Sequence, residues 1–149
     1  RGLCRSIGVS NFTIENLKEL EEKYDVLPAI NQVEFHPYHY QKELLEYCNS
    51  KNIIIEAYSP LVHAKRMDEP RLIAISDELS KTPAQVLIRW AIQKGMVVLP
   101  KSVNQDRIVE NFAVFDFDIS NSLMKRLDDL DERYVTCWDP HNPPPYAPV

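Results

Sequence analysis

A lysine, a serine and an arginine that lie close together in the sequence could bind one phosphate group. Lys101 and Ser102 follow a short apolar run, and Asn104 is a residue type that caps the start of a helix. Arg107 would then lie in the first turn of that helix, where free backbone N–H groups favour an anion. An ammonium, a hydroxyl and a guanidinium could thus converge on one site. The alternative interpretation is a solvated strand end followed by a capped helix.

Polar residues also end three other short apolar runs. They are Ser10–Asn11, then Gln32 with Glu34 and His36, and finally Tyr58–Ser59. In a parallel α/β barrel the loops after the strands open onto one face, where the active site lies. These polar ends would therefore meet at one site.

Each of these residues also has a structural interpretation. Ser10 and Asn11 could simply form a turn and begin a helix. Gln32 and Glu34 could bind each other inside a barrel, and Tyr58 could be a core residue whose hydroxyl is satisfied. His36, at a strand end, is of a residue type that could act as a proton donor, and we expect His63 to face solvent.

Four short strands, each followed by one or more helices, would position these side chains. The apolar runs cover residues 6–9, 29–35, 53–58 and 96–99. The helical patterns that follow begin near Thr13, Leu44, Pro70, Thr82, Asn104 and Ser120. The first of these helices is expected to carry Leu17, Leu20 and Tyr24 on one face. Successive strand–helix units predict a parallel sheet with right-handed crossovers.

The glycine content distinguishes between two kinds of parallel sheet. The chain has only three glycines, at positions 2, 8 and 95, so the Gly-x-Gly-x-x-Gly segment of a doubly wound dinucleotide fold is missing. A barrel of eight strand–helix units needs about 250 residues. Four units in 149 residues therefore predict half of such a barrel.

Composition excludes several functional classes. A formal charge of -5 without a block of basic residues argues against nucleic-acid binding. No apolar run approaches the roughly 18 residues of a membrane-spanning helix, and the first five residues lack a signal-peptide pattern, so we expect a cytoplasmic protein. Cys4, Cys48 and Cys137 are odd in number and far apart, so we expect no disulfide framework and no metal site.

Several segments resemble those of the aldo-keto reductase family. They occur in the family's order over nearly the whole chain: Gly8–Phe12, Asn31–Tyr38, Ala57–Leu61, Leu99–Val103 and Arg107–Phe112. The chain is similar to the carboxyl-terminal half of an NADP-dependent member. The implied fold is α/β: the carboxyl-terminal half of a (β/α)8 TIM barrel, with about four parallel strand–helix units and an extra helix. Residues 1–149 would form one partial domain, with residues 131–149 as its C-terminal loop and tail.

The resemblance implies cofactor roles for the polar strand ends. Ser10, Asn11 and Gln32 would hydrogen-bond the nicotinamide carboxamide, and Tyr58 would stack on the nicotinamide ring. The positions that match the family's contacts along the pyrophosphate are Ser59 and Leu61.

The adenosine end of the cofactor would lie after the fourth strand. Lys101, Ser102 and Arg107 would hold the 2′-phosphate, which favours NADP(H) over NAD. The other matching cofactor positions are Val103, Glu110 and Asn111, of which the last two would meet the adenine.

The resemblance implies no catalytic residue in this chain. The family's catalytic aspartate, tyrosine, lysine and histidine belong to the first four strand–helix units. Tyr58, Lys101 and His36 match cofactor or structural positions instead. In the complete enzyme, a hydride would pass from NADPH to a small aldehyde or ketone, and Trp138 matches the family's substrate-pocket loop.

A half barrel has open sheet edges and exposed apolar side chains, which favour association. We expect the partner to be the missing amino-terminal half or a second copy of the chain. Two alternatives remain: a non-catalytic NADP-binding module, and a structural half barrel that dimerises. Many members of the family have a longer loop here that folds over the pyrophosphate, so the short connection from Val62 to Pro70 implies incomplete closure over the cofactor and faster cofactor release.

Overall fold

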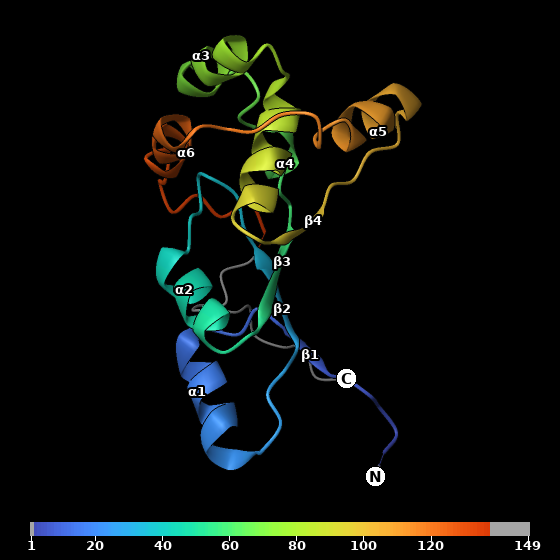
Figure 1. Ribbon diagram of the computed structural model, residues 1–149, viewed down its shortest axis with the longest axis vertical. Coiled ribbons are helices and arrows are strands. Elements are labelled where there is room, and N and C mark those ends of the chain that lie inside the picture. The colour runs from blue at the N-terminus through green and yellow to red at the C-terminus, as the bar shows by residue number, and fades with distance from the viewer. Residues whose placement is uncertain (1, 138–149) are drawn as a thin grey trace.

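Four parallel strands in chain order form the sheet of this protein (Figure 1). The computed structural model describes residues 2–137. Within them, the strands are β1 Gly8–Ser10, β2 Ile30–Glu34, β3 Ile54–Tyr58 and β4 Val97–Leu99. Neighbouring strands pair in parallel, with Ser10 opposite Gln32 and Gln32 opposite Glu56. The predicted parallel half barrel is confirmed, and β1 and β4 are the two edges of the sheet.

Helices follow every strand. They are α1 Ile14–Lys23, α2 Lys42–Ser50, η1 Val62–Ala64, α3 Pro70–Leu79, α4 Pro83–Gln93, α5 Gln105–Phe112 and α6 Asn121–Asp128. Among residues 2–137, each helix falls short of the length and apolar character that a membrane crossing requires.

Side chains that the sequence offers as caps begin most of these helices. Thr13 and Thr82 each accept a hydrogen bond from a backbone N–H in the first turn and form a capping box. Asn104 and Ser120 cap α5 and α6 in the same way. Gly95 follows the end of α4 with φ +81°, a backbone conformation that glycine adopts without a steric penalty.

One prediction about α1 is wrong. Tyr24 does not share the buried face of Leu17, because the helix ends at Lys23 and Tyr24 takes an extended conformation. Its side chain is 62% exposed, whereas Leu17 is fully buried. A backbone that leaves the helix no longer follows the 3.6-residue period, and so the residue loses its place on the apolar face.

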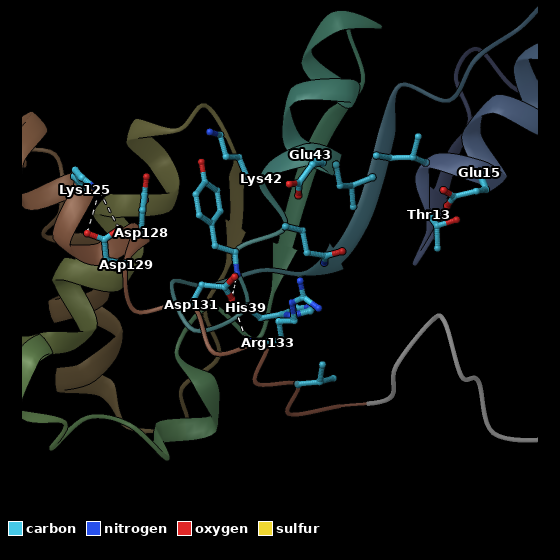
Figure 2. A pocket seen from close by; sticks show the side chains of 15 residues that line it. Thr13, Glu15, His39, Lys42, Glu43, Lys125, Asp128, Asp129, Asp131 and Arg133 are labelled. Atoms are coloured by element: carbon cyan, nitrogen blue, oxygen red, sulfur yellow. Dashed lines mark hydrogen bonds and ion pairs between the residues drawn. The ribbon is translucent and has the colours of Figure 1, made fainter.

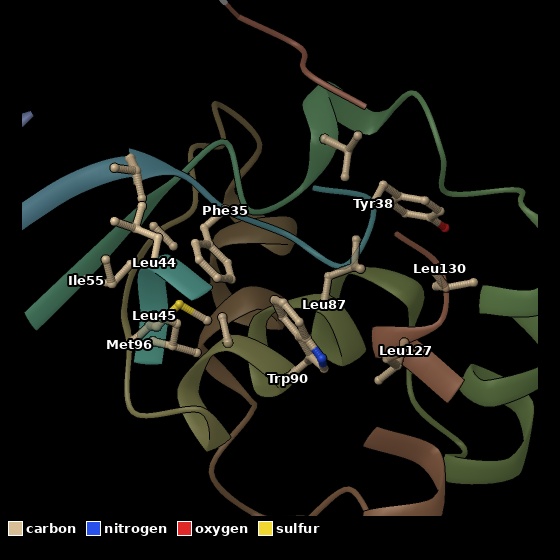
Figure 3. Packing of buried hydrophobic residues seen from close by; sticks show 14 of the residues in the cluster. Phe35, Tyr38, Leu44, Leu45, Ile55, Leu87, Trp90, Met96, Leu127 and Leu130 are labelled. Atoms are coloured by element: carbon tan, nitrogen blue, oxygen red, sulfur yellow. The ribbon is translucent and has the colours of Figure 1, made fainter. Parts of the chain in front are cut away.

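The two faces of the sheet have different environments. Val33, Ile55 and Ala57 point to the helical side and are buried, and they join a core centred on Phe35 and Trp90 (Figure 3). The side chains that alternate with them lie on the opposite face. There, the apolar residues Ile54, Val97 and Leu99 are 47%, 44% and 40% exposed. This open face is the one that lines the interior of a closed barrel.

A partly buried polar contact links α4 to α6. The indole Nε1 of Trp90 donates to Asp128 Oδ1 at 2.7 Å, and Lys94 Nζ lies 3.0 Å from the same carboxylate. The Trp90 ring also packs against Tyr40, with 5.4 Å between the ring centroids. The core and these contacts hold the helices against the sheet and thereby position the strand ends.

Candidate functional site

Polar side chains form a row on the open face near the carboxyl ends of β1, β2 and β3. The Ser10 hydroxyl donates to the backbone oxygen of Gln32 at 3.0 Å. Gln32 Nε2 donates to the Glu56 carboxylate, its direct neighbour on β3. Gln32 therefore binds Glu56, and the interpretation in which it binds Glu34 is wrong. No role was predicted for Glu56, because the partner of its side chain depends on strand register.

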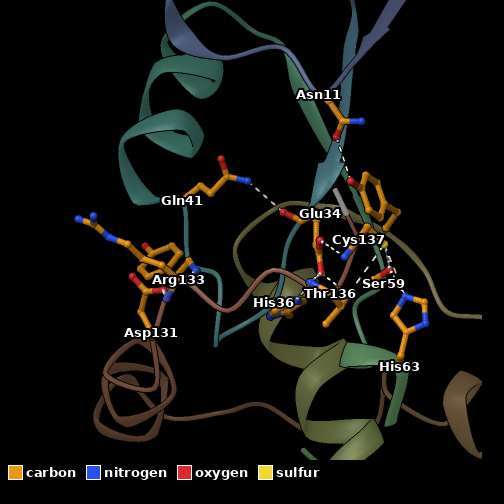
Figure 4. Close-up of polar contacts among 12 residues, drawn as sticks. Asn11, Glu34, His36, Gln41, Ser59, His63, Asp131, Arg133, Thr136 and Cys137 are labelled. Carbon is orange, nitrogen blue, oxygen red and sulfur yellow. Dashed lines mark hydrogen bonds and ion pairs between the residues drawn. The ribbon is translucent and has the colours of Figure 1, made fainter. Parts of the chain in front are cut away.

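Asn11 and Tyr58 meet above this row. Asn11 has φ +57° and donates its backbone N–H to the Gln32 oxygen at 2.8 Å, so the chain turns sharply out of β1. The Tyr58 hydroxyl donates to Asn11 Oδ1 at 3.0 Å (Figure 4). Burial raises the pKa of Tyr58 to about 12, and the negative charge of Glu34 adds to this shift. The phenol is therefore neutral over the physiological range, and its bond to Asn11 fixes the orientation of the ring.

A buried amide holds the turn that carries Asn11. Asn31 is fully buried on β2, and its Nδ2 donates to the backbone oxygen of Phe12 at 2.9 Å. Its Oδ1 accepts the Phe12 N–H at 3.3 Å. This pair of bonds satisfies two backbone groups of the turn, and it explains why an asparagine occupies the helical side of the strand.

Glu34 binds the segment that follows α6. The carboxylate is 3% exposed, and it accepts hydrogen bonds from Thr136 N at 2.8 Å, Cys137 N at 3.1 Å and the Thr136 hydroxyl (Figure 4). His36 Nε2 lies 3.1 Å from the same group. Burial alone would raise the pKa of Glu34, but these hydrogen bonds outweigh burial and lower the pKa to about 2. His36, itself 1% exposed, supports the carboxylate, and this placement favours a structural role.

Ser59, His63 and Cys137 form a cluster beside Tyr58. The Ser59 Oγ lies 3.1 Å from His63 Nε2 and 3.5 Å from Cys137 Sγ. His63 is exposed, as expected, but it also makes these contacts. It lies in η1, whose three residues all have φ between 50° and 60°. Leu61, just before η1, is partly buried against the core.

The end of β4 presents two cations beside a helix start. Lys101 and Arg107 are exposed, and within residues 2–137 neither side chain pairs with a carboxylate. Asn104 Oδ1 accepts the Arg107 N–H at 3.0 Å, and Ser102 Oγ accepts the Asn104 N–H at 3.1 Å. Val103, between them, is 87% exposed. The arrangement leaves two positive charges available to an anion at the N-terminus of α5.

A cavity of about 450 Å³ adjoins this helix start. Asn111 is 8% exposed and faces it, whereas Glu110 accepts a hydrogen bond from the Thr82 hydroxyl at the start of α4. The lining residues are Pro100, Ser102, Ile108, Val109, Asn111 and Phe112. The walls are largely apolar, which suits a flat aromatic group next to a charged one.

A larger hollow of about 810 Å³ lies on the helical side of the molecule (Figure 2). It opens between α6 and the N-terminal ends of α1 and α2. Side chains of both charges line it, among them Lys42, Arg133, Asp128 and Asp131. None of the residues that the sequence singled out for a site lies in its wall.

Strand register places the polar residues at the end of β3 next to those at the end of β4. Tyr58 pairs with Leu99, so the segments that carry Ser59 and Lys101 leave the sheet side by side. Ser10, Gln32, Asn11 and Tyr58 are already linked by the contacts described above. Trp138, predicted to contact substrate, lies outside the described residues.

Comparison with known proteins places the chain among reductases. The model of the Aldo/keto reductase family matches residues 1–71 and 63–132. The sequence is 44% identical over 140 residues to an uncharacterized oxidoreductase of Schizosaccharomyces pombe, covering 93% of this chain and 51% of that protein. It is 45% identical over 134 residues to the glyoxal reductase of Bacillus subtilis, covering 89% and 49%.

Solved structures agree with these relatives. An aldo-keto reductase from a Medee basin deep-sea metagenome superposes with a TM-score of 0.88 at 36% identity, over 93% of this chain and 52% of that one. An aldo-keto reductase complexed with NADPH gives a TM-score of 0.86 at 31% identity, over 99% and 51%. The chain spans about half the length of the relatives it matches.

Proposed function

Because the chain belongs to the aldo/keto reductase family, we propose that it supplies the cofactor-binding half of an NADPH-dependent oxidoreductase that reduces aldehydes or ketones to alcohols. One observation carries the proposal. Among residues 2–137, Lys101 and Arg107 have no acidic partner, and they lie at the start of α5 beside an apolar cavity. Similar proteins include a reductase complexed with NADPH and a glyoxal reductase.

The chemistry of this donor set fits the 2′-phosphate of NADP(H). A phosphate dianion favours an ammonium, a guanidinium and free N–H groups together. We assign the 2′-phosphate to Lys101, Ser102 and Arg107. The adjoining cavity would take the adenine, with Asn111 in its wall and Glu110 and Val103 at its margin.

We assign the nicotinamide end to the linked residues of β1, β2 and β3. Ser10, Asn11 and Gln32 offer hydroxyl and amide groups for a carboxamide, and Tyr58 offers the face of an oriented ring. NADPH, when bound, supplies the hydride for carbonyl reduction. This chain's residues would hold the cofactor in one orientation. The remaining cofactor positions, along the pyrophosphate, are Ser59 and Leu61.

We place the proton donor of the reaction outside this chain. Tyr58 lies at the proposed nicotinamide position, but its hydroxyl already donates to Asn11. Its pKa of about 12 makes it a poor acid near neutral pH. The chain alone is therefore expected to bind NADPH without reducing a carbonyl compound.

Fluorescence titration of the purified chain with NADPH tests the binding half of the proposal. We expect saturable binding of NADPH and weaker binding of NADH. A folded chain that binds neither dinucleotide contradicts the proposal. Turnover of glyoxal or another small aldehyde by the chain alone would contradict the assignment of catalysis to other residues.

The open sheet face supports a second candidate, self-association. Ile54, Val97 and Leu99 expose apolar surface on this face, and β1 and β4 are the edges of the sheet that the described residues form. A second copy could cover this surface as the missing half of a barrel would. Sedimentation equilibrium gives the oligomeric state, and the fluorescence titration gives the affinity for NADPH. A dimer that does not bind NADPH favours a structural half barrel, whereas a dimer that binds NADPH favours a non-catalytic binding module.

A further inference from the structure

Glu56 is a carboxylate next to the proposed nicotinamide position. It stands opposite Gln32 on β2 and opposite Val97 on β4, so the three side chains form one row on the open face of the sheet. Gln32 Nε2 donates a hydrogen bond to the Glu56 carboxylate. Val97 is apolar and offers the carboxylate no hydrogen bond. Within this row, Gln32 is therefore the residue that binds Glu56.

The contact with Glu56 determines which way the Gln32 amide points. A carboxylate only accepts hydrogen bonds, whereas an amide has N–H donors on its nitrogen and an acceptor at its oxygen. The amide therefore turns its Nε2 towards Glu56, and its Oε1 is the atom left for a ligand. A flipped amide would set two acceptors against each other, which is unfavourable in a partly buried row.

Asn11 is oriented in the opposite sense. The Tyr58 hydroxyl donates to Asn11 Oδ1 at 3.0 Å, so Asn11 Nδ2 is the atom left for a ligand. The backbone N–H of Asn11 donates to the backbone oxygen of Gln32 at 2.8 Å, which keeps the two residues adjacent. A group bound between them would meet an acceptor from Gln32 and a donor from Asn11.

A carboxamide matches this pair of atoms, and a carboxylate does not. The NH2 of a carboxamide can donate to Gln32 Oε1 while its oxygen accepts from Asn11 Nδ2. A carboxylate has no hydrogen for Oε1, and it carries a charge of the same sign as Glu56. We propose that Glu56 is a positioning residue that orients Gln32 and thereby makes the site specific for nicotinamide dinucleotides over nicotinic acid dinucleotides. This inference rests on the proposed function, which assigns the nicotinamide end to Gln32 and Asn11.

Displacement of NADPH, followed by its fluorescence, measures this specificity. NADP+ and nicotinic acid adenine dinucleotide phosphate differ only at the carboxamide, so the ratio of their dissociation constants reports on that group. We expect the wild-type chain to bind NADP+ on the order of 10-fold more tightly. Glu56→Leu removes the acceptors at similar size and should bring the ratio towards one. Glu46→Leu alters an exposed glutamate on α2 and, as the matched control, should keep the wild-type ratio.

The 3-acetylpyridine analogue of NADP+ separates orientation from charge. It is neutral and keeps the carbonyl oxygen, but it has a methyl group in place of the NH2. A fixed Gln32 Oε1 should disfavour this analogue as well, and Glu56→Leu should reduce the preference against it. Glu56→Gln, which adds no apolar surface beside Val97, should change both ratios in the same direction. Loss of the nicotinic acid preference alone would mean that only charge acts, and it would overturn the positioning role.

NMR of the Gln32 side-chain amide gives a readout that needs no cofactor. Its N–H signals, assigned with Gln32→Glu, should differ from those of exposed glutamines in the wild-type chain and should shift towards them in Glu56→Leu. Identical signals in the two chains would overturn the positioning role. A wild-type chain that does not bind NADPH overturns the proposed function and the specificity with it, whereas binding with unchanged ratios in Glu56→Leu overturns only the role of Glu56.

Discussion

Replacing Glu34 with glutamine should destabilise the chain in a pH-dependent way. The carboxylate accepts hydrogen bonds from Thr136 and Cys137 and lies 3.1 Å from His36. A glutamine keeps the size of the side chain, but it has one acceptor oxygen instead of two and places an NH2 group among donors. The segment at residues 136–137 should then detach from β2.

The pKa shift determines the size of this effect. The pKa of Glu34 falls from 4.5 to about 2 on folding, and the group is 3% exposed, so solvent screening is small. Ionisation of this group therefore contributes about 3 kcal/mol to the free energy of unfolding above about pH 6. Because the folded pKa is the lower one, the contribution decreases as the pH falls below 4.5. At about pH 3, it has decreased to about 1 kcal/mol.

Urea denaturation followed by circular dichroism at several pH values tests this reasoning. Wild type and Glu34→Gln should differ by about 3 kcal/mol near pH 6 and by about 2 kcal/mol less near pH 3. Glu22→Gln, which neutralises an exposed carboxylate on α1, is the control and should have little effect at either pH. A difference between wild type and Glu34→Gln that does not change with pH would refute the argument.

Three further predictions concern the phosphate site and the thiol of Cys137. Lys101→Ala should weaken NADPH binding by about 10-fold or more in a fluorescence titration, through loss of a charge-assisted hydrogen bond, and should leave NADH binding nearly unchanged; equal losses would exclude the 2′-phosphate assignment. Asn104→Ala removes the cap of α5 and should lower the free energy of unfolding in urea by about 1 kcal/mol; no change would mean that water replaces the cap. Saturating NADPH should slow maleimide labelling of Cys137, because Ser59 touches both the thiol and the proposed pyrophosphate position. An unchanged rate at saturation would separate the two sites.

The sequence predicted the order of the elements well because their signals are local. Thr13, Thr82, Asn104 and Ser120 begin helices by bonding to a backbone N–H three residues ahead, which requires no knowledge of the fold. The failure at Tyr24 has the opposite cause. Its hydrophobic spacing matches the helix, but the helix ends one residue earlier, and boundaries of this kind depend on tertiary packing.

The contacts within the site were less predictable. Gln32 and Glu34 are two residues apart and share a face of the strand, which suggested that they bind each other. In the structure each finds a partner across a longer distance in sequence: Glu56 from β3, and Thr136 from the segment after α6. Which residues stand opposite depends on strand register and on the path of the C-terminal segment. The cluster around Cys137 was missed for the same reason.

The two ends of the proposed cofactor site are prepared for binding in different ways. Tyr58 is already oriented by Asn11, so stacking on it requires little further loss of side-chain freedom. Lys101 and Arg107 have no acidic partners to give up among the described residues, so an incoming phosphate breaks no ion pair there. The nicotinamide end, however, faces the open side of the sheet, where Val97 and Leu99 remain exposed to water. Stacking of the nicotinamide on the Tyr58 ring would be strengthened by exclusion of water from this side of the sheet. We therefore expect the proposed adenosine site to be nearly complete within this chain, whereas orientation of the nicotinamide would depend on the wall that closes the barrel.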